Sequence, residues 1–148
     1  MKIHLAKFKE ADFPEYKSWY KDADLNLRLG PMDDEWLEHV TKATDGSQYS
    51  FFRDEELIAV VGIKFPNNQY PAYYITDFAM KPGLRGQGIG TEVLSELIKQ
   101  HVLEPDQTWR AFIDVKNPKA KIFFEKNGWA CTTNEPDEHG MFMLELKK

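Results

Sequence analysis

The sequence has 148 residues, of which 42% are hydrophobic and 14% aromatic, enough to predict a single compact domain over residues 1–148. The formal net charge of −5 disfavours nucleic acid as a partner, because proteins that bind it normally present a cationic face. Cys131 is the only cysteine, which excludes an intrachain disulfide and a cysteine-based zinc cluster and favours a cytoplasmic location. The alternating N-terminus and the lack of a run of about 18 apolar residues predict neither export nor a membrane span.

The first third of the chain predicts one strand followed by two short helices. Residues 2–8 alternate apolar and polar side chains, as half-buried strands do. Residues 12–20 carry aromatic side chains at helical spacing. Residues 33–43 predict a second helix, which Asp33 or Asp34 can cap at its start.

The middle of the chain predicts three strands and a helix. Residues 48–65 are expected to form two strands joined by a hairpin turn at residues 53–56, and residues 72–80 form a third. Apolar residues at helical spacing predict a helix over residues 89–103, the clearest in the chain.

The end of the chain predicts a strand, a helix and one or two further strands. Residues 108–115 form the first strand, and residues 141–148 form a closing strand. Between them, residues 117–128 predict a helix that is capped by Asn117 and stopped by Gly128.

A glycine-rich stretch, KPGLRGQGIG, joins the strand at residues 72–80 to the helix at residues 89–103. Its glycine spacing matches neither the Walker loop nor the dinucleotide fingerprint. A glycine-rich turn from strand to helix nevertheless suits an anionic ligand, because the first N–H groups of a helix lack intrahelical acceptors. Arg85 adds a guanidinium suited to phosphate oxygens. A flexible connection without a ligand is the alternative.

Two strings of residues carry a resemblance to a known family. AMKPGLRGQGIGTEVL resembles motif A of the GNAT superfamily of acyl-CoA-dependent N-acyltransferases, Q/R-x-x-G-x-G/A, with Arg85, Gly88 and Gly90 at the fixed positions. NPKAKIFFEKNGW is similar to the second signature of that family. The residues that fit it are Asn117, Ala120, Phe124, Glu125, Lys126, Gly128 and Trp129.

The resemblance implies an α/β (α+β) fold with a mixed, mostly antiparallel sheet of six or seven strands, splayed in its middle and flanked by about four helices. It also implies acetyl-CoA as the cosubstrate, with no metal, entering between the strands that end at Met80 and Val115. The implied cofactor-binding residues are Phe78, Met80, Arg85, Gln87, Gly88, Ile89, Gly90, Thr91, Asn117, Ala120 and Phe124.

The implied activity is transfer of acetyl to a primary amine by direct attack in a ternary complex. A lysine-like ammonium has a pKa near ~10.4, so forming the free amine at pH 7 costs roughly 4.6 kcal/mol unless the site assists. Asp77 is the candidate base, and Tyr73, Tyr74, His101 and His139 are further candidates for catalytic roles.

Phe124 stands where the family often has a proton-donating tyrosine, so the acid is in doubt. A catalytically weak CoA-binding sensor or interaction module is therefore the alternative function.

The acceptor is expected to be a small-molecule or peptide amine, with no nucleic acid or membrane as partner, and the sequence leaves open whether a homodimer forms. In the family, the segment that corresponds to residues 19–36 usually shapes the acceptor side. Its side chains that could face a cationic amine are Asp22, Asp24, Asp33, Asp34 and Trp36, although helix capping, solvation or core packing explains each of them as well.

Overall fold

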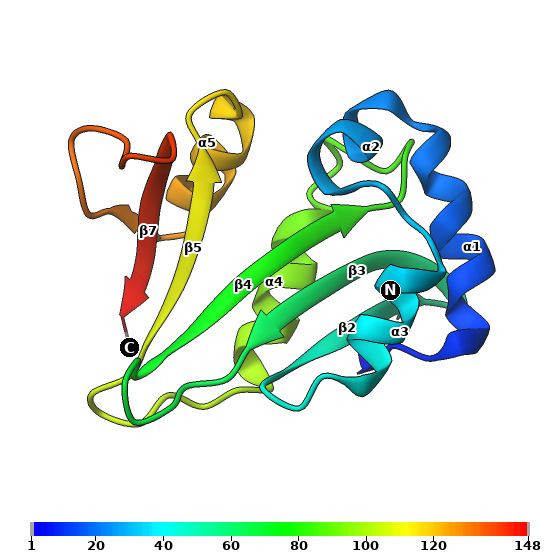
Figure 1. Ribbon diagram of the computed structural model, residues 1–148, viewed down its shortest axis with the longest axis horizontal. Coiled ribbons are helices and arrows are strands. Elements are labelled where there is room, and N and C mark those ends of the chain that lie inside the picture. Colours follow the sequence, from blue (N-terminus) through cyan, green and yellow to red (C-terminus); the bar gives the residue numbers. More distant parts are fainter. Residues whose placement is uncertain (1, 148) are drawn as a thin grey trace. The chain divides into compact units, whose positions relative to one another are not determined.

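The computed structural model describes residues 2–147, which form two compact units (Figure 1). Unit 1 consists of the chain up to Ile63 together with Asp77–Val102, and unit 2 consists of Lys64–Thr76 together with the chain from Leu103 onward. The single domain expected from the sequence stays a prediction.

Seven strands form one sheet in the order β1-β2-β3-β4-β5-β7-β6, and strand β4 contributes residues to both units. The β1–β2, β5–β7 and β6–β7 pairs are antiparallel, whereas β4 and β5 are parallel. The mixed, mostly antiparallel sheet of six or seven strands is thus confirmed. The parallel register runs from Ala72 opposite Thr108 to Ile75 opposite Ala111.

Unit 1 is built around three antiparallel strands and the second half of β4. The strands are β1 (Ile3–Lys7), β2 (Gly46–Arg53), β3 (Glu56–Lys64) and β4 (Ala72–Met80). Every residue of β3 from Leu57 to Ile63 is buried, so both faces of this strand are covered. Figure 1 shows α3 in front of the unit 1 strands and α4 behind them.

The helices of unit 1 fall into an N-terminal group and one long helix that follows β4. They are the 3-10 helix η1 (Glu10–Asp12), α1 (Phe13–Ser18), the 3-10 helix η2 (Trp19–Lys21), α2 (Ala23–Leu29), α3 (Asp34–Lys42) and α4 (Ile89–Lys99). Asp33, not Asp34, caps α3, because its Oδ1 accepts a hydrogen bond from the Trp36 N–H at 3.0 Å.

Helix α2 is absent from the sequence-based prediction, which expected two helices before β2 and about four in all. The structure has three α-helices before β2 and five in the described residues 2–147. Leu25, Leu27 and Leu29 alternate with polar residues, so the segment lacks the spacing of an amphipathic helix. Leu25 is buried whereas Leu27 is 80% exposed, and the cap at Asp22 starts the helix instead.

Helix α4 ends at Lys99, four residues before the predicted end at residue 103. The His101 ring stops it: Nδ1 lies 2.8 Å from the Leu97 carbonyl, which can only accept, so Nδ1 donates. The Tyr49 hydroxyl lies 3.0 Å from the other ring nitrogen, Nε2. Val102 lies beyond the helix end and is 79% exposed, so it is not part of the apolar face of α4.

Unit 2 pairs a small part of the sheet with one helix. It contains the start of β4, then β5 (Thr108–Asp114), α5 (Pro118–Lys126), β6 (Ala130–Cys131) and β7 (Met141–Lys147). Helix α5 contacts β5, β6 and β7. Trp109, Ala111 and Leu144 are buried in this unit.

The end of α5 is a Schellman motif. Gly128 is left-handed at φ 90°, its N–H donates to the Glu125 carbonyl, and the Trp129 N–H donates to the Phe124 carbonyl. The rings of Phe124 and Trp129 pack edge to face at 4.8 Å, which supplies the apolar contact that accompanies this motif. The glycine and the aromatic residue of the second signature therefore have a structural explanation, and the predicted stop at Gly128 is confirmed.

The β2–β3 hairpin turns through two non-glycine residues in left-handed conformation, Asp54 (φ 50°) and Glu55 (φ 72°). Two-residue hairpins of this kind prefer Asn or Asp followed by Gly, because a Cβ atom is strained at positive φ.

We expect Glu55→Gly to raise the free energy of unfolding by up to about 1 kcal/mol, since relief of the left-handed strain exceeds the entropy cost of glycine. Urea unfolding followed by tryptophan fluorescence measures this. Glu55→Ala removes the carboxylate but keeps Cβ, so it is the matched control. A glycine variant no more stable than the alanine variant would contradict the strain argument.

Candidate functional site

The loop between β4 and α4 in unit 1 holds three glycines in left-handed conformation, Gly83 (φ 95°), Gly86 (φ 78°) and Gly88 (φ 78°). A Cβ atom added at any of them would meet no other atom within 4 Å. Glycine is therefore required here by backbone conformation, and the space beside the loop is open. The Gln87 amide closes the loop by donating to the Gly83 carbonyl at 3.0 Å.

Helix α4 begins immediately after this loop, with Gly88 as its N-cap. Glycine offers no side chain to accept the first-turn N–H groups, and no side-chain hydrogen bond caps the helix. Ile89 is buried beneath the turn, whereas Gln87, Gly88 and Thr91 are exposed. The start of α4 thus presents uncapped N–H groups and the positive end of the helix dipole at an open, glycine-lined surface, which suits an anion.

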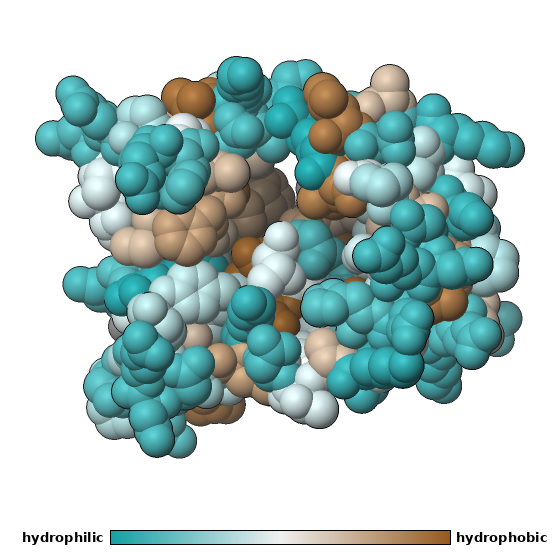
Figure 2. Space-filling view, in the orientation of Figure 1, coloured by the Kyte–Doolittle hydropathy of each residue, from teal (hydrophilic) through white to brown (hydrophobic). Residues whose placement is uncertain are grey.

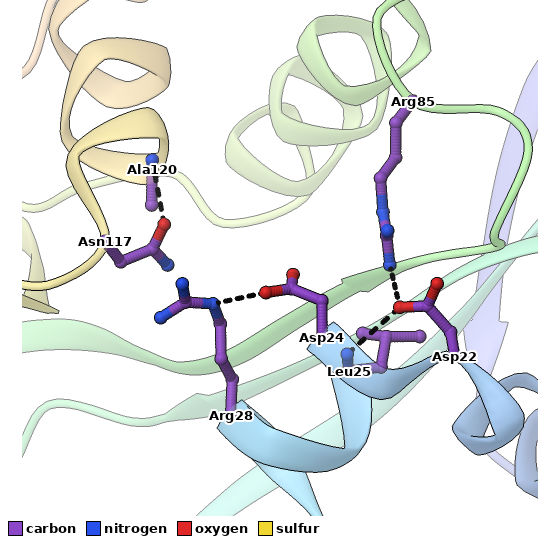
Figure 3. Close-up of polar contacts among 7 residues, drawn as sticks. All are labelled: Asp22, Asp24, Leu25, Arg28, Arg85, Asn117 and Ala120. Carbon is purple, nitrogen blue, oxygen red and sulfur yellow. Dashed lines mark hydrogen bonds and ion pairs between the residues drawn. The ribbon is translucent and has the colours of Figure 1, made fainter.

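Arg85 of the loop is not a free guanidinium. Its Nη2 lies 3.1 Å from Oδ2 of Asp22, as Figure 3 shows. The same oxygen accepts the Leu25 N–H at 3.1 Å and so caps α2. The pKa of the Asp22 carboxyl lies below its usual range. The hydrogen bond from the Leu25 N–H lowers it most, and the hydrogen bond from the Arg85 guanidinium is the second cause. One carboxylate therefore ties the start of α2 to the glycine loop.

The acidic residues of the segment that was expected to face the acceptor are mostly engaged elsewhere. Asp22 caps α2 and pairs with Arg85, and Asp24 pairs with Arg28 of the same helix at 3.0 Å (Figure 3). Asp33 caps α3. These three carboxylates have structural roles, the alternative that the sequence had left open.

Asp77 points toward the N-terminal helices of unit 1, which settles the face of β4 that the sequence could not assign. The Gln48 side chain, only 6% exposed on β2, donates from Nε2 to Asp77 Oδ2 at 2.6 Å. This buried amide fixes the orientation of the carboxylate.

Tyr16 and Tyr20 lie close enough to Asp77 for its negative charge to affect the pKa of both hydroxyl groups. Their hydroxyl oxygens are 2.5 Å apart, and their rings meet edge to face. Burial raises the pKa of Tyr16 far above its ordinary value, and the negative charge of Asp77 raises it further. Burial and, to a smaller extent, the same charge raise the pKa of Tyr20 to about 12, although the hydrogen bond with Tyr16 lowers it. Both tyrosines are therefore neutral at physiological pH.

The other tyrosine candidates belong to the part of β4 that lies in unit 2. The Tyr73 ring stacks on Trp109 with centroids 4.8 Å apart. The Tyr74 hydroxyl accepts a hydrogen bond from Arg110 at 3.2 Å, and Arg110 also pairs with Glu145 at 3.0 Å. The hydrogen bond with Tyr74 and, after it, the contact with Glu145 raise the pKa of the Arg110 guanidinium. Tyr74 thus belongs to a polar network that links three strands.

The residues of the second signature lie on and before α5 in unit 2. Asn117 is the N-cap of α5, and its Oδ1 accepts the Ala120 N–H at 3.4 Å, as Figure 3 shows. Phe124 is 4% exposed, between the rings of Phe123 and Trp129. Asn117 is a cap and Phe124 a core residue, and their contact with a cofactor stays a prediction.

Of the two histidine candidates, His101 lies away from the start of α4, and His139 belongs to unit 2. His101 follows the other end of α4, and an 11-residue helix is about 16 Å long. The His139 side chain is 77% exposed in unit 2, where it lies 3.5 Å from Glu138. Within residues 2–147 no three or more His, Cys, Asp or Glu side chains gather closely enough to hold a metal ion. No helix in that range is both long and apolar enough to span a bilayer.

Sequence reasoning did not assign Gln48, Tyr16, Tyr20 or the Asp22–Arg85 ion pair to the site. The two tyrosines stand four residues apart at helical spacing, which indicated only a buried face. Gln48 is a single amide in an aromatic-rich strand, and its burial was the missing signal. A contact between residues 63 positions apart has no signal in one sequence.

Comparison with known protein families gives one match that covers most of the chain. The model of the acetyltransferase (GNAT) family matches residues 8–129. The chain belongs to the GNAT family. This range includes the glycine loop, Asp77 and the N-terminal helices of unit 1, and it confirms the resemblance seen in the two signatures. A search of curated proteins found no match.

Solved GNAT structures share the fold at low sequence identity. An acetyltransferase from Thermus thermophilus is 14% identical with a TM-score of 0.82, over 98% of this chain and 96% of that one. AAC(6')-Ib in complex with ribostamycin and coenzyme A is 14% identical with a TM-score of 0.80, and the match covers 100% of this chain and 94% of that one. The ribosomal-protein-S18-alanine N-acetyltransferase from Escherichia coli is 14% identical with a TM-score of 0.72, and the match covers 98% of this chain and 93% of that one. At these identities the likeness shows the fold.

We expect Asp22→Asn to remove a pH-dependent contribution to the stability of this GNAT chain while keeping a capping oxygen. Because the folded-state pKa of Asp22 is depressed, the ionised carboxylate stabilises the fold above its unfolded pKa of about 3.9. That contribution is lost as pH falls through the folded pKa.

The melting temperatures of both proteins between pH 7 and pH 3 measure this. The wild type should exceed the variant at pH 7, and the difference should shrink toward pH 3. Asp24→Asn, which breaks the neighbouring pair with Arg28 and leaves the α2 cap intact, is the control. A difference that does not change with pH would contradict the assignment.

Proposed function

We propose that this chain transfers acetyl from acetyl-CoA to a primary amine by direct attack in a ternary complex. The observation that carries the proposal is the open loop of left-handed glycines that leads into the uncapped start of α4. A diphosphate that carries negative charge fits such a terminus, because the N–H groups and the helix dipole act on the same charge.

The N–H groups of Gln87 to Thr91 would bind the diphosphate of acetyl-CoA. Arg85 uses only Nη2 for Asp22, so the remaining donors of its guanidinium fork can meet phosphate oxygens. Phe78 and Met80 would offer the backbone of β4 to the pantetheine arm in the manner of an added strand. Asn117, Ala120 and Phe124 complete the set that the family resemblance predicts.

Asp77 would act as the general base, directly or through one water. The amine nitrogen attacks the thioester carbonyl carbon, the carbon–sulfur bond breaks, and the proton of the nitrogen passes to the Asp77 carboxylate. Gln48 holds that carboxylate in one orientation. Tyr16 and Tyr20, both neutral, place hydroxyl groups rather than charges beside it. The departing thiolate has an ordinary pKa near ~8.5 and takes its proton from water, Tyr73 or Tyr74.

A CoA-binding sensor without catalysis is the second candidate. The observation that favours it is the lack of a hydroxyl at Phe124, whose ring is buried in the core of unit 2. Thiol release from acetyl-CoA across a panel of amines distinguishes the two functions. Binding of acetyl-CoA without acylation of any amine would favour the sensor.

The glycine loop can be tested with two variants that differ only in charge. Asn and Asp both tolerate left-handed backbone, so Gly88→Asn and Gly88→Asp carry the same strain. We expect calorimetry to show CoA binding at least about 10-fold weaker for the Asp variant than for the Asn variant, because the new carboxylate repels the diphosphate. Equal affinities would mean that CoA does not bind at this loop.

We expect Asp77→Asn to lower kcat by about 100-fold or more, in the range that general bases supply, with little change in CoA affinity. Steady-state kinetics over pH 6–10 and calorimetry measure the two effects. The activity of the variant should recover toward high pH, where the amine loses its proton unaided. Asp45→Asn, on a bend before β2, is a control of equal charge change. An unchanged kcat would exclude Asp77 as the base.

A further inference from the structure

A hollow of about 500 Å³ lies on unit 1, among the first two α-helices and the 3-10 turn that joins them. Its lining residues are Pro14, Lys17, Ser18, Tyr20, Lys21, Asn26, Pro31 and Met32. The lining contains two cations, three other polar side chains, two prolines and a methionine, and it contains no carboxylate. In Figure 2 the surface over α1 is mainly hydrophilic, whereas the surface over α2 also carries hydrophobic residues.

The two lysines of the hollow carry charge that the protein does not neutralise. Lys17 and Lys21 are four residues apart along α1 and η2, and neither forms an ion pair with any residue in the range 2–147. Lys17 Nζ lies 5.8 Å from the centre of the Phe13 ring, a contact that leaves its charge in place.

The carboxylates that could have neutralised these lysines are held by other groups. Glu15 accepts the Trp19 indole N–H at 2.7 Å. Asp22 is bound to Arg85, and Asp24 to Arg28, at 3.1 and 3.0 Å. Although the whole chain has a net charge of −5, the lining of the hollow itself therefore carries two positive charges and no negative one.

Tyr20 connects the hollow to the candidate base. It lines the hollow, and its hydroxyl lies 2.5 Å from the Tyr16 hydroxyl, beside Asp77. A molecule in the hollow thus lies against the outer member of the tyrosine pair. The carboxylate that would accept a proton from the reacting amine lies on the inner side of that pair.

We propose that the hollow binds an anionic group of the acceptor, so that the substrate is an amine that also carries a carboxylate or a phosphate, and not a polycation. This inference rests on the proposed function. The lysines would meet the anion, Ser18 and Asn26 would supply hydrogen-bonding groups, and Met32 would contact the apolar part of the acceptor. A polyamine would place positive charge against two unpaired lysines, which disfavours its binding.

The test compares acceptors that differ only in the anion. The acceptor pairs are glycyl-leucine and its C-terminal amide, phosphoethanolamine and ethanolamine, with spermidine as the polycation. We expect kcat/KM for the wild type to be about 10-fold higher for the anionic member of at least one pair, and to fall as salt rises. The two pairs separate carboxylate from phosphate as the preferred anion.

The variant Lys17→Gln/Lys21→Gln should lose that preference through a higher KM, with kcat and the reaction of the uncharged partner unchanged. Lys42→Gln/Lys99→Gln removes the same charge from α3 and α4, where both lysines pair with a glutamate, and should keep the preference. A wild type that acetylates spermidine or the neutral amines as well as the anionic ones overturns the inference but leaves the proposed function intact. A wild type that binds CoA and acetylates no amine overturns both.

Discussion

The site depends on the left-handed backbone of the β4–α4 loop, where Gly86 and Gly88 turn the chain so that α4 begins without a side-chain cap. A residue with a Cβ atom would strain this backbone, and a capping side chain would satisfy the N–H groups that the loop presents. The structure thus leaves polar groups unsatisfied where most helices satisfy them, which is the property that an anion-binding terminus requires.

A few polar contacts position the groups of the candidate site within unit 1. Asp22 joins the start of α2 to Arg85, and Gln48 orients Asp77 toward the tyrosine pair. Each contact links segments that are far apart in the chain. The N-terminal helices, the strands and the glycine loop are therefore one structural unit, which contains both the candidate base and the candidate anion-binding terminus.

Local chemistry decides how much of this could be predicted from the sequence. The glycine spacing, the Asn117 cap and the stop at Gly128 depend on neighbouring residues, so the loop and the ends of α5 could be predicted. Helix α2 could not, because Leu27 is exposed and breaks the apolar pattern. The partners of Arg85 and Asp77 could not be predicted either, because they depend on tertiary contacts across 63 and 29 positions.

Amide chemical shifts of ¹⁵N-labelled protein during titration with CoA test the central claim most directly, since they report on the backbone N–H groups themselves. The account predicts that the largest shifts fall on Gln87 to Thr91, and that pantetheine, which carries no phosphate, leaves these amides nearly unchanged. Shifts confined to other parts of the chain on saturation with CoA would contradict it.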